Sequence, residues 1–206
     1  FGNSQVSLML KSSGHVGGDL VGFYPIYTDK IGLYSIDVSG HGISSALMTA
    51  RLAGYLSQVP EQNVALKRRA DGTFSHLSPA DVVARLNRLI MEEMETEHYF
   101  TLLLAVADLK TGNVQMAQAW HPHPLVQRSG GSVDQSGPGG LPVGLIEGAN
   151  YRQFEISLYP GDRILILSDG VTECPDPAGV LLGEDGLEDA MKRLKDVKGE
   201  ALLEAL

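Results

Sequence analysis

The amino-acid sequence predicts an α+β fold in which the sheets are mostly antiparallel. Apolar stretches with strand character come in pairs around short polar turns, and the helical patterns do not follow every strand. This order differs from the regular alternation of strand and helix that is typical of a parallel sheet. With 206 residues, 43% of them hydrophobic, the chain is long enough for one sizeable core and short for two ordinary domains. We therefore expect one domain over residues 1–206.

The first half of the chain is predicted to contain a strand pair and a helix. Within residues 15–38, two stretches rich in Val, Ile, Phe and Tyr flank the polar turn TDK, which indicates a β-hairpin. From Ile43 to Leu56 the apolar residues recur at helical spacing. Residues 60–77 lack a clean period and are expected to form a surface connection, with the KRR of residues 67–69 on a solvated face.

A second helix is predicted over residues 78–94. Ser78 is a favourable N-cap, Pro79 suits the first helical position, and the acid at Asp81 complements the helix dipole. The remaining elements are two strands within 99–120 around the turn LKTGN, a Gly/Pro/Ser-rich stretch over 129–144, a further pair of strands within 151–173, and an amphipathic segment from about Glu184.

Composition disfavours several classes of function. The net charge of −9 argues against binding to nucleic acid or to an anionic membrane surface. The only cysteine, Cys174, excludes an internal disulfide, suits a reducing compartment such as the cytoplasm, and is expected to be an ordinary loop residue. The longest apolar runs are far shorter than the roughly 20 residues that span a bilayer. Since the chain opens at Phe1 and stops in EALLEAL, we expect both ends to be cuts in a longer protein.

Three aspartates share one context, because each ends or borders an apolar strand and is followed by a turn. They are Asp19 in VGGDLV, Asp37 in IDVSGHG and Asp169 in LILSDGVTE. Carboxylates that converge from strand ends suit Mg²⁺ or Mn²⁺, and neighbouring glycines leave room for a ligand near the main chain. A single Asp before Gly is more often a simple turn former. The pattern itself predicts an acidic metal site for phosphoryl or other hydrolysis.

The histidines are less specific. His41 lies between two glycines at the start of the first helix and is a candidate acid, phosphate contact or turn residue. His121 and His123 in AWHPHPLV superficially resemble a metal pair, but the intervening proline and the lack of a partner cluster favour a rigid loop over a zinc site.

Taken together, the motifs resemble those of the SpoIIE/RsbU-type serine phosphatases, the bacterial branch of the metal-dependent PPM (type-2C-like) protein phosphatases. The resemblance is carried, from about residue 11 to 194, by GHVGGDLVGFYPI, IDVSGHGISSALMTARL, TLLLAVADLKTGNV, HPHPLV, GGLPVGL and YPGDRILILSDGVTE. It implies two stacked antiparallel β-sheets flanked by α-helices, with a centre of two Mn²⁺ or Mg²⁺ ions at one edge.

The same resemblance implies the ligands. Asp37 would bridge both metals, the Val38 backbone carbonyl would bind one of them, Asp19 would support that metal directly or through water, and Asp169 would hold the other. The loops around these ligands would depend on two glycines, Gly18 and Gly40.

The implied reaction is in-line attack of metal-activated water on a phosphoserine or phosphothreonine, with water or His41 protonating the leaving oxygen. By resemblance, the substrate is a phosphorylated STAS-type anti-sigma-factor antagonist, and an upstream receiver or sensor domain switches the enzyme. The helices over 43–57 and 78–94 are candidates for a switching or homodimer surface, although such apolar stripes more often pack into the core.

Three features depart from the family pattern. The last metal-binding aspartate normally follows the helix that here ends at LLEAL, so we expect a C-terminal strand beyond Leu206. The usual AGHPPP is here AWHPHP, with Trp120 where a small residue is expected. Leu20 and Val21 replace the Phe-Tyr that commonly follows GGD, which leaves the ligands untouched.

Two other functions remain as alternatives. A catalytically silent module of the same fold would bind its partner without hydrolysis, and it gains weight from the missing last aspartate. A metal-dependent nuclease is disfavoured by the negative charge and the lack of a basic groove.

Overall fold

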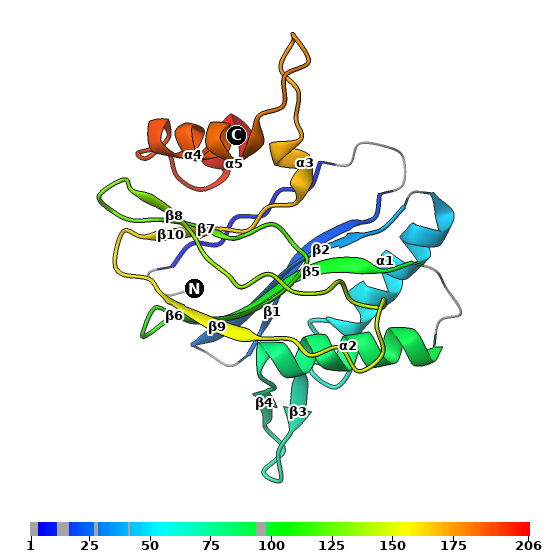
Figure 1. Ribbon diagram of the computed structural model, residues 1–206. Helices are drawn as coiled ribbons and strands as arrows, with labels where there is room; N and C mark the ends of the chain where they lie inside the picture. The colour runs from blue at the N-terminus through cyan, green and yellow to red at the C-terminus, as the bar shows by residue number, and fades with distance from the viewer. Residues whose placement is uncertain (1–3, 12–16, 27–28, 41, 94–97) are drawn as a thin grey trace.

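The computed structural model describes residues 4–11, 17–26, 29–40, 42–93 and 98–206, and it has two antiparallel sheets between layers of helix (Figure 1). The larger sheet has the order β1-β2-β5-β6-β9, formed by Asp19–Pro25, Lys30–Val38, Phe100–Asp108, Asn113–Ala119 and Gln153–Ser157. The smaller sheet has the order β10-β7-β8, formed by Arg163–Leu165, Leu125–Gln127 and Val133–Gln135. The expected α+β fold and the two predicted hairpins, β1–β2 and β5–β6, are confirmed.

The alternation of side chains along the strands divides the core into layers. Even-numbered residues of β2 and β5, such as Ile36 and Leu104, pack with the helices α1 (Ile43–Tyr55) and α2 (Pro79–Glu93). Odd-numbered residues, such as Leu103, face the smaller sheet. The outer face of that sheet is covered by α4 (Gly183–Arg193) and α5 (Glu200–Ala205) (Figure 1). The stacked-sheet architecture implied by the family resemblance is therefore confirmed.

Helix α2 begins as the sequence predicts. The Ser78 hydroxyl donates to the Asp81 carboxylate at 2.6 Å, and the Asp81 backbone N–H donates to the Ser78 Oγ at 3.2 Å. This exchange satisfies one of the N–H groups that the first turn of a helix leaves without a backbone acceptor.

Helix α1 buries a different face from the one that its apolar residues indicate. The buried residues are Ser45, Met48 and Leu52, whereas Ile43 is 77% and Leu47 65% exposed. The expectation that the apolar stripe packs into the core is thus wrong for Ile43 and Leu47. The reason is the rotation of the helix on the sheet, which the spacing of apolar residues does not fix.

Two other segments differ from expectation. The predicted surface connection over 60–77 contains a small hairpin, β3 (Leu66–Arg68) and β4 (Phe74–His76), which projects from the body in Figure 1. The two strands predicted within 151–173 exist as β9 and β10, but they join different sheets. Asp169 begins a short helix, α3 (Asp169–Thr172), where a turn was expected.

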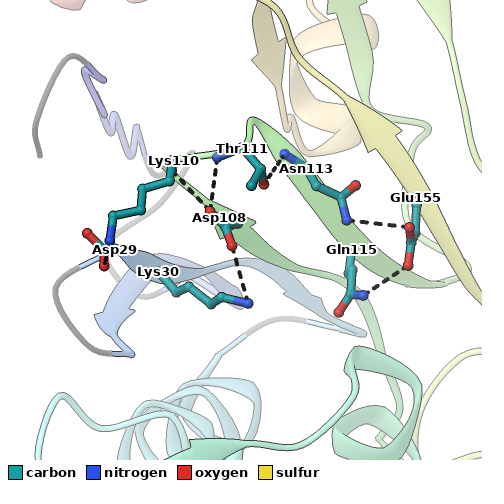
Figure 2. Close-up of polar contacts among 8 residues, drawn as sticks. All are labelled: Asp29, Lys30, Asp108, Lys110, Thr111, Asn113, Gln115 and Glu155. Carbon is teal, nitrogen blue, oxygen red and sulfur yellow. Dashed lines mark hydrogen bonds and ion pairs between the residues drawn. The ribbon is translucent and has the colours of Figure 1, made fainter.

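The end of the larger sheet that carries the β1–β2 and β5–β6 turns is rich in compensated polar contacts (Figure 2). Lys30 pairs with Asp108 at 3.4 Å and Lys110 with Asp29 at 2.7 Å, while Gln115 donates to Glu155 at 2.9 Å. Asp29, Asp108 and Glu155 thus each have a cationic or amide partner. Within the described residues, no helix is both long and apolar enough to cross a membrane.

Candidate metal centre

The opposite end of the same sheet brings two of the predicted aspartates together. In the antiparallel register of β1 and β2, Asp19 lies directly opposite Asp37, and Thr101 of β5 lies opposite Asp37 on its other side. Directly opposed residues have Cβ atoms about 4.5–5.5 Å apart and point to the same face. Asp19, Asp37 and Thr101 therefore form one row across three strands, on the face that meets the smaller sheet.

The short helix α3 adds two further acids to this row. Asp169 is its first residue, and Glu173 caps its C-terminus; both act electrostatically on Asp37. Glu173 is not among the site residues that the sequence motifs predict. Its spacing of four residues from Asp169 would have placed both on one face of a helix, had a helix rather than a turn been expected there.

The proximity of these acids changes their protonation. Burial, together with the charges of Asp19, Asp169 and Glu173, raises the pKa of Asp37 from 3.8 to about 6. The pKa of Asp19 is also raised, first by burial and then by the charge of Asp169. No described lysine or arginine forms an ion pair with any of the four acids. Among the described residues, this edge of the sheets thus holds negative charge without a lysine or arginine partner, in contrast to the opposite end.

The Val38 carbonyl lies against Gly18, in the segment before β1. A Cβ added to Gly18 would lie 2.6 Å from the Val38 oxygen, so this approach is possible only for glycine. The Gly18 carbonyl accepts hydrogen bonds from the Val38 N–H at 3.2 Å and from the Thr49 hydroxyl at 3.0 Å. Thr49, which sequence reasoning missed, therefore fixes this loop from helix α1.

The turn after β2 is held by a second residue that the sequence did not indicate. The His98 Nδ1 lies 2.8 Å from the Ser39 carbonyl oxygen, and its Nε2 lies 2.9 Å from the Ser44 Oγ. Gly40 has φ +83°, a backbone conformation that side chains rarely adopt, and it packs against the His98 ring. The predicted residue His41 lies outside the described residues.

The oxygen donors suit a hard divalent cation. Carboxylates and a backbone carbonyl are the ligands that Mg²⁺ and Mn²⁺ prefer, and a cation would relieve the repulsion that raises the pKa of Asp37. Among the described residues, no three carboxylate, imidazole or thiol groups are yet grouped closely enough to form a complete metal site. The donor set fits such an ion in kind, and ion binding would require the carboxylates to draw closer.

The AWHPHP loop lies beside the same row. His121 is 3% exposed, and its Nδ1 lies 2.8 Å from the Thr101 Oγ1. His123 is exposed, whereas His121 is buried, so the two histidines of this loop face different surroundings. Trp120 has φ 55° and is 65% exposed, at the position where the family resemblance expects a small residue.

A family model described as stage II sporulation protein E (SpoIIE) matches residues 28–206. The chain belongs to the SpoIIE family. Two curated relatives from Bacillus subtilis (strain 168) are similar to this SpoIIE-family chain. "Phosphoserine phosphatase RsbP" is 28% identical to this chain over a match that covers 82% of this chain and 40% of the relative. "Phosphoserine phosphatase RsbU" is 26% identical over a match that covers 77% of this chain and 44% of the relative. The chain thus spans less than half the length of either relative.

Among solved structures, the PP2C phosphatase domain of the cell fate determinant SpoIIE from Bacillus subtilis, with a fragment of its regulatory domain, has a similar fold. Its TM-score is 0.71 with 20% identity, over 93% of this chain and 53% of that one. At this identity the likeness supports the fold of the SpoIIE-family chain, which the layered sheets already indicate.

Proposed function

We propose that the chain is a metal-dependent protein phosphatase domain that hydrolyses a phosphoserine or phosphothreonine on a regulatory protein. The observation that carries the proposal is the group of uncompensated acids around Asp37, in a chain of the SpoIIE family. The names of RsbP and RsbU as phosphoserine phosphatases support the same class of reaction.

In this proposal the strand ends hold two Mn²⁺ or Mg²⁺ ions. The Asp19, Asp37 and Asp169 carboxylates and the Val38 carbonyl would be their ligands, with Asp37 shared between the two as the family resemblance implies. When bound, the ions would activate water and neutralise charge on the phosphoryl oxygens. Gly18 supports the site by allowing the Val38 carbonyl to approach the segment before β1.

The other residues have positioning roles. Thr49 and His98 hold the two loops on either side of the Asp37–Val38 strand end, which keeps this strand end in place. A bound metal would supply the activated water for the attack, so this chain would need no serine or cysteine nucleophile. His41 or water would supply the proton to the leaving serine or threonine oxygen.

We extend the proposal to partners on the grounds of the family resemblance. The substrate would be a phosphorylated STAS-type anti-sigma-factor antagonist, and an upstream receiver or sensor domain would control the activity. The exposed Ile43 and Leu47 on α1 give this helix an apolar surface that suits a homodimer. Sedimentation velocity tests this last point, since Leu47→Glu would then lower the fraction of dimer.

The decisive test is hydrolysis of p-nitrophenyl phosphate against Mn²⁺ concentration. We compare the wild-type chain with Asp37→Asn and with the matched control Asp189→Asn, an exposed acid on α4. The proposal requires Mn²⁺-dependent turnover in the wild type and in Asp189→Asn, and its loss in Asp37→Asn.

Other outcomes point to different functions. Turnover that persists in Asp37→Asn would refute the bridging role of Asp37. A folded, Mn²⁺-saturated wild-type protein without turnover would favour the catalytically silent partner-binding module.

A further inference from the structure

His121 lies beside the carboxylate row, yet the proposed reaction assigns it no role. Its ring is buried between the sheets, and its Nδ1 contacts the hydroxyl of Thr101 at 2.8 Å. Thr101 is the cross-strand partner of Asp37. One side chain therefore separates the imidazole from the proposed bridging ligand.

The backbone around His121 is fixed from two sides. The Gln118 side chain, which is 1% exposed, donates to the His121 carbonyl at 2.5 Å and accepts from the Gly139 N–H at 3.0 Å. At Trp120 the left-handed backbone turns the chain, so that the Trp120 side chain points outward while His121 is buried. A strained residue next to a buried imidazole indicates that the placement of this ring matters.

The second nitrogen of the ring faces the other half of the site. The His121 Nε2 is buried and has no hydrogen-bond partner among the described residues. Burial lowers the pKa of His121, and the Leu167 backbone opposes this lowering, which places Leu167 near the ring although the Nε2 makes no hydrogen bond. Leu167 precedes Asp169 by two residues, so it belongs to the segment that carries the acid of α3.

We propose that His121 is a positioning residue that couples the two halves of the carboxylate site. Its Nδ1 accepts a hydrogen bond from the Thr101 hydroxyl and so holds that side chain beside Asp37. Its Nε2–H donates to the Leu167 carbonyl when the Asp169 segment moves toward Asp37 to bind a divalent cation. The inference rests on the proposed metal centre.

The geometry favours this coupling in two ways. The described ligands are not yet grouped for a metal, so the acids must approach one another on binding. A buried nitrogen without a partner is unfavourable, and closing its contact with Leu167 therefore favours the same movement.

The test separates positioning from folding by replacing both partners of one hydrogen bond. Thr101→Val and His121→Leu each leave a buried polar group without its partner, whereas the double variant makes the pair apolar and restores much of the stability. Thr101→Ser keeps the hydroxyl. The matched controls are Thr111→Val, at the opposite end of the sheet, and His76→Leu, on the β3–β4 hairpin away from the carboxylates.

Mn²⁺ affinity is measured by titration calorimetry, and amide hydrogen exchange is followed over residues 167–172. We expect Thr101→Val, His121→Leu and the double variant to bind Mn²⁺ about 10–100-fold more weakly, with Thr101→Ser and both controls close to wild type. Mn²⁺ should slow exchange over 167–172 in the wild type and much less in the His121→Leu protein. The stability of the double variant should recover while its affinity does not.

The proposal would be overturned if a folded double variant bound Mn²⁺ with wild-type affinity. If His121→Leu does not fold, wild-type affinity in a folded Thr101→Val protein would overturn it. Phosphatase activity is assayed in the same samples. Intact Mn²⁺ binding without hydrolysis in the wild type would refute the proposed function alone, and the affinities of the variants would still decide the role of His121. A wild-type protein that binds no Mn²⁺ would overturn both proposals.

Discussion

Replacement of Asp37 by Asn should make the metal-free protein more stable while removing the proposed activity. The carboxylate is half-buried beside three other acids, and its pKa is about 6 against an ordinary value of 3.8. The folded state therefore binds the Asp37 proton more tightly than the unfolded state does. Stability is consequently lost as the pH rises from about 4 to about 6.

The size of the effect follows from the same values. A difference of about 2 pH units corresponds to about 3 kcal/mol at 1.36 kcal/mol per unit. Since the group is only half-buried, solvent screening reduces this to about 1–2 kcal/mol. Asn cannot ionise, so Asp37→Asn should raise the free energy of unfolding by about 1–2 kcal/mol at pH 7 and by little at pH 4.

The assay is urea denaturation in EDTA at pH 4 and pH 7, followed by circular dichroism. With saturating Mn²⁺ the order should reverse, because only the wild type gains the free energy of metal binding. The electrostatic account of the site would be refuted if the two proteins had equal free energies of unfolding at pH 7. It would also be refuted if Asp37→Asn raised the free energy of unfolding at pH 4 by as much as at pH 7.

Four further predictions concern stability. Gly18→Ala places a methyl group against the Val38 carbonyl, which cannot rotate away, and should cost about 1–3 kcal/mol. Gly54→Ala, in α1 with open space around it, should instead stabilise by up to about 1 kcal/mol in the same denaturation series. Trp120→Gly relieves a left-handed backbone at an exposed residue and should change the unfolding free energy by less than about 1 kcal/mol; circular dichroism is needed because Trp120 is the only tryptophan. Burial lowers the pKa of His121 from 6.5 to about 4, so the unfolded state binds a proton at His121 more readily than the folded state does. The free energy of unfolding that the neutral ring contributes is therefore present above pH 6.5 and lost as the pH falls to about 4, and His121→Leu should flatten this acid limb, the fall in stability between pH 6.5 and 4. Destabilisation by Gly54→Ala, a large loss in Trp120→Gly, or an unchanged acid limb in His121→Leu would each contradict the corresponding argument.

Local signals in the sequence were sufficient for the elements whose causes are local. The alternation of residues 15–38 and the polar turn within it set the β1–β2 hairpin, and its register places Asp19 opposite Asp37. Ser78, Pro79 and Asp81 identified the start of α2 through hydrogen bonds within one helical turn.

Other features depend on contacts between distant segments. The rotation of α1, which exposes Ile43 and Leu47, is set by the sheet beneath it. Strands β9 and β10 are adjacent in sequence but join different sheets, because each pairs with the open edge available to it. The short β3–β4 hairpin has too few residues to show a period.

The sequence by itself predicted the kind of site, since glycines and acids at strand ends favour oxygen ligands for a hard cation, and its motifs identified the family. Only the tertiary structure decided which other groups lie near these acids. Glu173 reaches Asp37 through a short helix, Thr49 and His98 hold the loops, and His121 approaches through Thr101. These contacts join residues that are far apart along the chain, and their geometry arises from the packing of two sheets, which no local pattern records.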